Sequence, residues 1–293
     1  MYSLVNVHPI VAMLYFLSVL IITMFAANPV LVILALLGGI SFFATLEKRE
    51  GLLKSLGFYM AVFLLVAFTN PLFSHNGATP LFFINNSPIT LEALLYGVNI
   101  GVMLVAVISW FGCFNYVMTS DKLLYLFGGI SPKLSLVMSS ALRFIPLFKQ
   151  QAERIRQAQT AMGLFATESW YDRLRGSLRV YSALITWALE NAIDTGSSMR
   201  SRGYGLKHRS QFAIYSFRHT DWLMIVVLII LDIIVITAMS GGELDFEFYP
   251  RISVARLETM QLLAYLAFGV ISFLPVILEI KENIQWKYYR SKI

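Results

Sequence analysis

The hydrophobic pattern of this chain consists of long apolar stretches separated by shorter polar ones. The stretches run for about 16 to 28 residues, the length that an α-helix needs to cross a hydrocarbon core about 30 Å thick. They do not alternate residue by residue, as the strands of a lipid-facing β-barrel do. The pattern therefore predicts an all-α integral membrane protein with about six transmembrane helices. The predicted spans are Ile10–Phe25, Val30–Leu46, Leu56–Phe73, Leu91–Met118, Trp222–Met239 and Met260–Ile280.

Turn-forming residues and prolines refine the two ends of this layout. Asn28 and Pro29 separate the first two spans so closely that we expect a helical hairpin. The first span shows no convincing cleavage site, so we expect it to be retained rather than removed as a signal peptide. In the last span, Pro275 is expected to kink the final turns or to end the helix early.

Lysine and arginine are unevenly distributed over the predicted loops. The loop Glu47–Ser55 and the tail after Ile280 are rich in basic residues, whereas Ser74–Thr90 has none and Gly241–Leu257 has more acidic residues than basic ones. Because basic loops remain on the cytoplasmic side of a membrane, both chain termini are predicted to be cytoplasmic. The predicted divisions are spans one to four (1–118), a cytoplasmic region (119–221), and spans five and six with a tail (222–293).

The cytoplasmic region has the periodicity of two amphipathic helices, one after Pro146 and one around Leu184. Each ends on a glycine, Gly163 or Gly203, the residue that most readily adopts the left-handed conformation at a helix C-terminus. The longest apolar piece between them, Val180–Leu189, is too short to cross a bilayer and is predicted to lie along or just below the membrane. The two stripes are Phe148, Ala152, Ile155, Ala158 and Met162, and Leu184, Ala188, Ala192, Thr195 and Met199.

Composition supports a membrane protein and narrows its chemistry. The chain is 57% hydrophobic and 14% charged, and twelve basic residues stand against five acidic ones between Arg143 and Arg218. That region is too apolar, and too poor in interleaved aromatic and basic residues, for nucleic-acid binding. The single Cys113 excludes an intramolecular disulfide, and the four histidines lack metal-ligand spacing. Phosphate-binding loop, zinc-protease and serine-hydrolase motifs are missing, so we do not expect this chain to hydrolyse ATP.

Two segments of the cytoplasmic region carry a specific resemblance. The first runs from Ala141 through Pro146 to the triplet Ala161-Met162-Gly163, and the second runs from Ala192 to Gly205 and contains Ser201-Arg202-Gly203. In this order, and together with His8-Pro9 before the first span, these residues resemble the transmembrane T component of energy-coupling factor (ECF) transporters. That group includes cobalt-type permease subunits of prokaryotic uptake systems.

The resemblance implies a non-catalytic subunit that transmits the motion of two cytoplasmic ABC-type ATPases to a small membrane-embedded, substrate-binding S component. ATP and Mg²⁺ are used by the ATPases, no cofactor is bound by this chain, and the cargo is a vitamin or a metal ion. In the family the two amphipathic helices are coupling helices, and the triplet at each end docks into an ATPase groove. The residues carried over to docking are Ala161, Met162, Gly163, Arg200, Ser201, Arg202 and Gly203.

At the first triplet, Met162 stands where the family usually has arginine, so apolar contact is expected to replace a salt bridge there. Arg202 can bind a carboxylate through two hydrogen bonds. The alternative is a basic residue that only favours a cytoplasmic helix end. Arg143, Pro146 and Tyr204 are assigned to coupling-helix geometry, and Arg143 is expected either to pair with Asp194 or to reach lipid phosphates.

Polar and small residues within the spans predict helix contacts. Asp232 lies in the middle of the fifth span, and we favour a polar contact to another helix, for example through Asn99, over a proton or substrate relay. Gly97 and Gly101 predict close packing of the fourth span inside the bundle. Trp187 is expected to be an interfacial anchor.

Two other classes of protein remain open. A membrane-embedded lipid-modifying enzyme needs polar residues clustered at the membrane surface, for which Glu190, Asp194 and His208 are the best candidates. A stand-alone secondary transporter usually has inverted repeats and several buried charges, whereas this chain offers Asp232.

Overall fold

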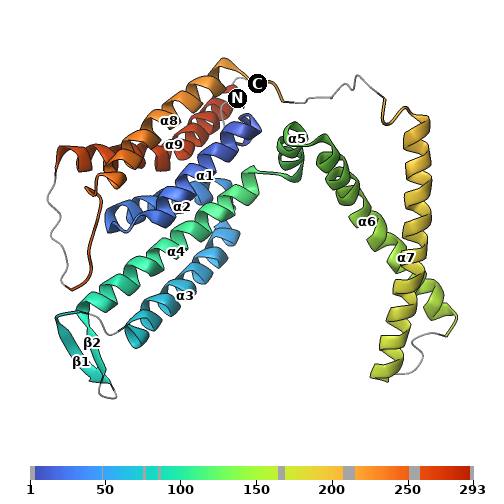
Figure 1. Ribbon diagram of the computed structural model, residues 1–293, viewed down its shortest axis with the longest axis horizontal. Coiled ribbons are helices and arrows are strands. Elements are labelled where there is room, and N and C mark those ends of the chain that lie inside the picture. The colour runs from blue at the N-terminus through green and yellow to red at the C-terminus, as the bar shows by residue number, and fades with distance from the viewer. Residues whose placement is uncertain are drawn as a thin grey trace. The chain divides into compact units, whose positions relative to one another are not determined.

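The protein is almost entirely helical in the computed structural model, which describes residues 4–47, 49–74, 77–84, 87–163, 169–206, 215–250 and 258–290 (Figure 1). A short 3₁₀ turn at Leu4–Asn6 precedes the first long helix. The helices are α1 (Pro9–Phe25), α2 (Pro29–Leu46), α3 (Arg49–Phe73), α4 (Leu91–Val117), α5 (Ser120–Ile130), α6 (Pro132–Ala161), α7 (Trp170–Ser201), α8 (His219–Ser240) and α9 (Thr259–Arg290).

Within the described residues, five helices are long and apolar enough to cross a membrane: α2, α3, α4, α8 and α9. Helix α1 is equally apolar but has 17 residues, which gives a rise of about 26 Å and places it at the short end of spanning lengths. The predicted all-α membrane fold is confirmed, and the predicted spans coincide with these helices to within a few residues at most ends.

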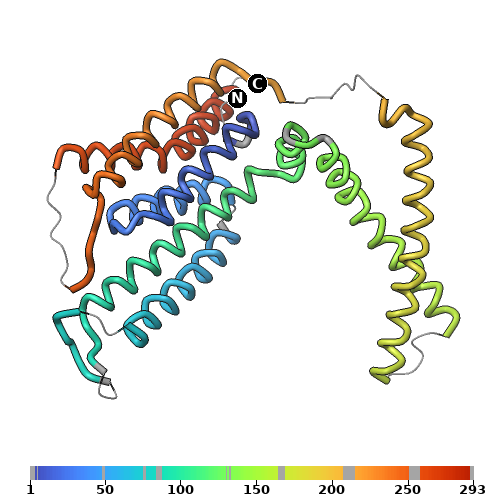
Figure 2. Tube along the Cα trace, in the orientation of Figure 1, coloured from blue at the N-terminus to red at the C-terminus, as the bar shows by residue number. Residues whose placement is uncertain are grey.

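The chain forms two compact units, residues 1–123 with 215–293, and residues 124–214. In the first unit, α4 lies between α2 and α3, α9 packs on α2, and α8 packs on α9 (Figure 2). Helix α1 contacts both α4 and α8. The six apolar helices therefore form one bundle, in which α3 and α8 are peripheral.

Glycines allow the closest helix contacts in this bundle. A Cβ added at Gly97 would lie 2.9 Å from the Ala67 carbonyl oxygen, and one added at Gly101 would lie 3.0 Å from the Phe63 ring. Both partners belong to α3, so the predicted packing role of this glycine pair inside the bundle is confirmed. On the other side of α2, a Cβ at Gly38 would lie 2.7 Å from the Cβ of Ser272 on α9.

One buried aromatic cluster of the bundle surrounds Trp110 of α4, which is fully buried. Its indole nitrogen donates to the Ala35 carbonyl oxygen of α2 at 2.9 Å. The rings of Tyr15, Phe16 and Phe42 surround it, with centroids 6.0 to 6.3 Å away. These contacts join α1, α2 and α4 and satisfy the one polar atom of the tryptophan.

Three predictions about helix ends are wrong. Residues 49–55, predicted as a loop, begin α3, and α9 continues through the buried Pro275 to Arg290, beyond the predicted end at Ile280. Helix α6 begins at Pro132 and runs through Pro146, well before the predicted start. A proline inside a membrane helix is tolerated because neighbouring groups satisfy the freed carbonyl.

Two strands and one helix of the fold were not predicted. Strands β1 (Pro80–Ile84) and β2 (Ser87–Thr90) pair in antiparallel fashion within the loop before α4, with Phe83 opposite Pro88. Helix α5 begins three residues after the end of α4 and crosses the boundary between the two units. The remainder of the second unit consists of α6 and α7.

Candidate functional site

The candidate site is built on α6 and α7, two helices of 30 and 32 residues. The ring of Phe148 on α6 meets that of Trp187 on α7 edge to face, with centroids 5.7 Å apart. Phe148 also stacks on Phe144 one turn earlier, with the two ring planes 10° apart. The predicted interfacial anchor Trp187 is thus part of the contact that holds the two helices together.

The two helices cross in antiparallel fashion, so their C-terminal ends lie on opposite sides of this contact, as Figure 1 shows. Fourteen positions separate Phe148 from Met162, and fifteen separate Trp187 from Arg202. At 1.5 Å per residue, each C-terminal end lies about 21 to 23 Å along its helix from the crossing. The pair therefore presents two ends at nearly equal distances from a shared centre.

The C-terminus of α7 closes with two backbone hydrogen bonds around Gly203. The Gly203 amide donates to the Arg200 carbonyl at 3.0 Å, and the Tyr204 amide donates to the Met199 carbonyl at 3.0 Å. This pair of bonds defines a Schellman motif, which requires a left-handed residue, and Gly203 has a φ of 86°. Tyr204 thus helps to close the helix, and the predicted glycine stop is confirmed.

The C-terminus of α6 also closes on a glycine with a left-handed backbone. Gly163 also has a φ of 86°, and its amide donates to the Thr160 carbonyl at 3.0 Å. Ala161 is the last helical residue, and the Met162 side chain is 70% exposed. A large apolar side chain is therefore presented at this end, whereas the α7 end presents the exposed Arg200, Ser201 and Arg202.

Two of the predicted residues meet in a polar cavity of about 510 Å³ between the first half of α6 and the last turns of α7. Arg143 and Arg202 both line it, together with Asp194. The Arg143 guanidinium lies 5.4 Å from the centre of the Phe144 ring. Among the described residues, no ion pair joins Arg143 to Asp194. The other lining residues are Ser139, Ser140, Thr195, Ser198 and Met199.

The predicted apolar stripes form the inner faces of the two helices. On α6, three residues of the stripe are half-buried: Phe148, Ala152 and Ile155. The last two, Ala158 and Met162, are exposed because they lie further from the contact with α7, toward the C-terminus of α6. On α7, Leu184, Ala188, Thr195 and Met199 are half-buried and Ala192 is exposed. The stripes therefore hold the helices to each other near the crossing.

A second stripe of larger apolar residues on α7 was missed. These side chains recur every three or four positions along the helix, and every one of them is exposed, Ile193 by 73%. The same spacing rule that found the inner stripe would have found this one. We call it the outer stripe, and it consists of Leu174, Leu178, Tyr181, Ile185, Leu189 and Ile193.

The residues weighed for an enzyme do not form a cluster in the described part of the chain. Glu190 is exposed on α7, Asp194 lines the polar cavity, and His208 lies outside the described residues. No group of three metal-ligating side chains occurs among the residues that the structure describes.

Asp232 makes the favoured polar contact to another helix, but the suggested partner, Asn99, is wrong. Asn99 donates to the Ala27 carbonyl oxygen at 3.2 Å. Asp232 of α8 instead faces Ser18 of α1, which interacts with its carboxyl group. Helix α4, which carries Asn99, packs on α1 and α2 rather than on α8, which accounts for the difference.

The chain is similar in sequence to one protein family and to several curated proteins. Residues 3–214 match the profile of the family described as CbiQ, cobalt transport protein. Two similar relatives are energy-coupling factor transporter transmembrane proteins EcfT, from Listeria innocua (33% identity; 34% of this chain, 38% of the relative) and Brevibacillus brevis (33% identity; 35% and 39%). A third EcfT, from Thermotoga maritima, is 28% identical over 60% of this chain and 66% of its own length. The chain thus aligns with well under half of the first two relatives.

Proposed function

This chain belongs to the CbiQ family of cobalt transport proteins, and from that membership we propose that it is the energy-coupling transmembrane subunit of an ATP-driven importer. Two cytoplasmic ABC-type ATPases bind and hydrolyse Mg-ATP, and this multi-pass membrane protein carries their motion to a small S component that holds the cargo. The cargo is a vitamin or a metal ion. The complex resides in the cell membrane of a prokaryote, with both termini of this chain in the cytoplasm.

The observation that carries this proposal is the crossed pair α6 and α7. Two rigid helices share one aromatic contact and end at matched distances from it, each on a left-handed glycine. A pair of this kind can transmit a displacement of two bodies, one at each end, to whatever contacts its middle. We assign Ala161, Met162 and Gly163 to one ATPase and Arg200 to Gly203 to the other.

The two ends differ in chemistry. Arg202 offers a planar, permanently charged group suited to a buried carboxylate, while Met162 offers an adaptable apolar side chain. We therefore propose docking through a charge-assisted pair at the α7 end and through apolar packing at the α6 end. Unequal ends suit two unequal ATPase subunits.

Reversal of the charge at Arg202 tests the docking proposal. Arg202→Glu is expected to reduce ATPase co-purification with this chain by about tenfold or more, because loss of a buried charged anchor leaves its partner unpaired. Arg179→Glu makes the same charge change at an exposed position in α7, 23 positions before Arg202, and is expected to leave the yield unchanged. Equal yields from the two variants, both inserted in the membrane, would sink the docking assignment.

The outer stripe of α7 supports a second part of the proposal, contact with the S component. Exposed apolar residues over about five helical turns mark a surface that is covered in the working complex. Ile185→Glu is expected to release the S component while the ATPases remain bound, because a carboxylate there must be desolvated. Glu190→Gln, an exposed change just beside the stripe, serves as its control. Retention of the S component by Ile185→Glu would remove the stripe from the proposed interface.

A further inference from the structure

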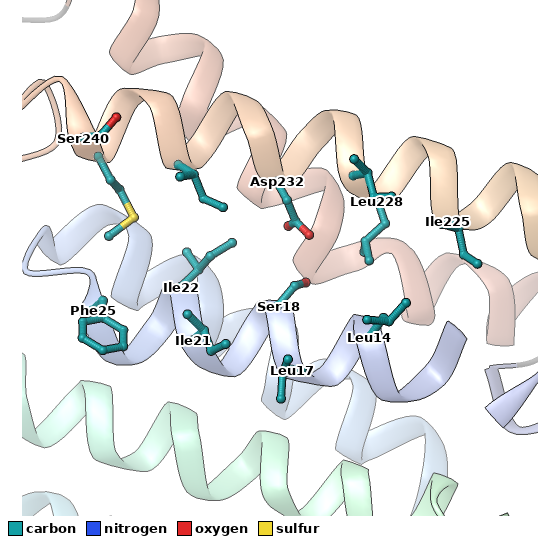
Figure 3. Close-up of a pocket in the computed structure, with 13 residues that line it drawn as sticks. Leu14, Leu17, Ser18, Ile21, Ile22, Phe25, Ile225, Leu228, Asp232 and Ser240 are labelled. Carbon is teal, nitrogen blue, oxygen red and sulfur yellow. The ribbon is translucent and has the colours of Figure 1, made fainter. Parts of the chain in front are cut away.

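The first unit contains an apolar groove between α1 and α8 that the coupling proposal does not use (Figure 3). Its volume is about 670 Å³. It extends from Leu14 to Phe25 on α1 and from Ile225 to Ser240 on α8, which corresponds to about 16 and 22 Å along the two helices. The walls are apolar except for Ser18, Asp232 and Ser240.

A carboxyl group sits near the middle of this groove. Figure 3 shows Asp232 and Ser18 pointing toward each other from the two helices. The Ser18 hydroxyl donates to the Tyr15 carbonyl oxygen at 3.1 Å and also interacts with the Asp232 carboxyl group. Oδ1 of Asp232 is buried and has no hydrogen-bond partner among the described residues. An ionisable side chain at this depth is costly unless a neighbour supplies hydrogen bonds.

An occupant of the groove must fit its apolar walls and supply a hydrogen-bond donor to Oδ1 of Asp232. A lipid acyl chain fits the apolar walls but has no donor for Oδ1. A symmetric contact with a second copy of this chain offers Asp232 only another carboxyl group, and the two groups repel each other when both are ionised. A transmembrane helix from a different chain, with a hydroxyl, amide or amino group at mid-depth, satisfies both the walls and the carboxyl group.

We propose that the groove between α1 and α8 binds one transmembrane helix of the S component, through apolar packing and a hydrogen bond from that helix to Asp232. This proposal rests on the coupling function above and adds a second point of contact, within the membrane. It predicts that S components of this system carry a polar donor near the middle of one span.

The test compares variants of the full chain, purified in mild detergent with its partners. Asp232→Leu removes the acceptor and is expected to lower S component yield about three- to twentyfold, the range of hydrogen bonds between membrane helices. Asp232→Asn keeps an acceptor oxygen and is expected to retain most of the S component. Unchanged yield in Asp232→Leu overturns the hydrogen bond.

A size change tests the groove separately. Ile229→Trp fills it, whereas Ile233→Trp makes the same change on an exposed side chain of α8 outside the groove. We expect S component loss from the first variant alone. If Ile229→Trp instead releases a bound phospholipid, or disrupts pairing of two copies of this chain, the proposed occupant is wrong. ATPase yield is measured in parallel: its retention shows that the coupling proposal stands whatever occupies the groove.

Discussion

The planes of the Phe148 and Trp187 rings meet at an angle of 75°. This contact lies at nearly the same number of residues from the C-terminal end of α6 as from that of α7. We call the two segments that run from the contact to these ends the arms. Each ring is half-buried, so the contact is held by a few side chains rather than by a deep core. A contact of this size can fix the angle between two helices while the arms beyond it remain free of each other. The crossing is therefore the point at which the two arms are mechanically joined.

Trp187→Ala is expected to weaken this crossing by about 1–3 kcal/mol, because the aromatic pair and part of a large apolar surface are lost. Coupled uptake should fall while membrane insertion is unchanged. Trp187→Phe retains an aromatic edge and should keep most of the activity. Cysteines placed at Phe144 and Asn191 report the geometry: less efficient cross-linking in Trp187→Ala than in Trp187→Phe is the expected result, and equal efficiency would contradict it.

Gly203→Ala is expected to destabilise the end of α7 by about 1–2 kcal/mol, because its φ of 86° is unfavourable for any residue with a Cβ. Gly196→Ala in the same helix is the matched control. It has open space around it and an ordinary helical backbone, so it should stabilise the helix by about 0.5–1 kcal/mol. Amide hydrogen exchange at the last turn of α7 measures both effects. Exchange is expected to be faster in Gly203→Ala and slower in Gly196→Ala than in the unaltered chain, and a change in the same direction in both variants would contradict the prediction.

Gly97→Leu is expected to separate α3 from α4 and to cost about 1–3 kcal/mol or more, because even a Cβ would lie 2.9 Å from backbone and side-chain atoms of α3. Gly269→Leu on α9, where a Cβ meets nothing within 4 Å, should be tolerated. Thermal unfolding of the two variants in detergent compares them. Similar melting temperatures would show that α3 and α4 do not pack as described.

His8 gives the bundle a dependence on pH. Its ring caps α1 by accepting from the Ile10 amide at 3.3 Å and packs on Phe217 with centroids 4.2 Å apart. Burial lowers the pKa of His8 below its ordinary 6.5, against the attraction of Asp221. The folded state therefore binds this proton less tightly than the unfolded chain does, so His8 stabilises most above about pH 6.5 and its contribution falls as the pH decreases.

The titration of His8 is checked by thermal unfolding between about pH 7.5 and pH 5.5, a range that brackets its ordinary pKa. His8→Asn keeps a capping acceptor but cannot be protonated in this range, so it should flatten the pH dependence. His219→Asn, at an exposed position of α8, should leave the dependence as it is.

Much of the fold was predictable because lipid imposes a simple rule: apolar runs of spanning length become helices. The glycine stops were predictable for an equally local reason, since few other residues tolerate a positive φ. The orientation of the spans and the docking roles of Arg202 and Met162 stay predictions.

The misses have a common physical cause. The path of α9 beyond Pro275, the pairing of β1 with β2, and the partner of Asp232 all depend on which segments lie side by side, which no local pattern encodes. The outer stripe of α7 is a different case. Its residues recur every three or four positions, as those of the inner stripe do, so the sequence offers two apolar faces on α7. Spacing alone does not tell which of the two faces packs against α6.

The number of residues between the Phe148–Trp187 crossing and each glycine end sets two quantities. One is the distance from the crossing to the helix end, and the other is the direction in which the end residues point around the helix axis. One residue inserted between Trp187 and Arg202 would advance the arginine by about 1.5 Å and turn it about 100° around the axis, away from the proposed docking partner. Seven residues would return it to within about 20° of its original direction, two turns further out. If Arg202 docks as proposed, working relatives should differ in arm length by whole heptads or by none at all, because any other insertion changes the direction in which the arginine points.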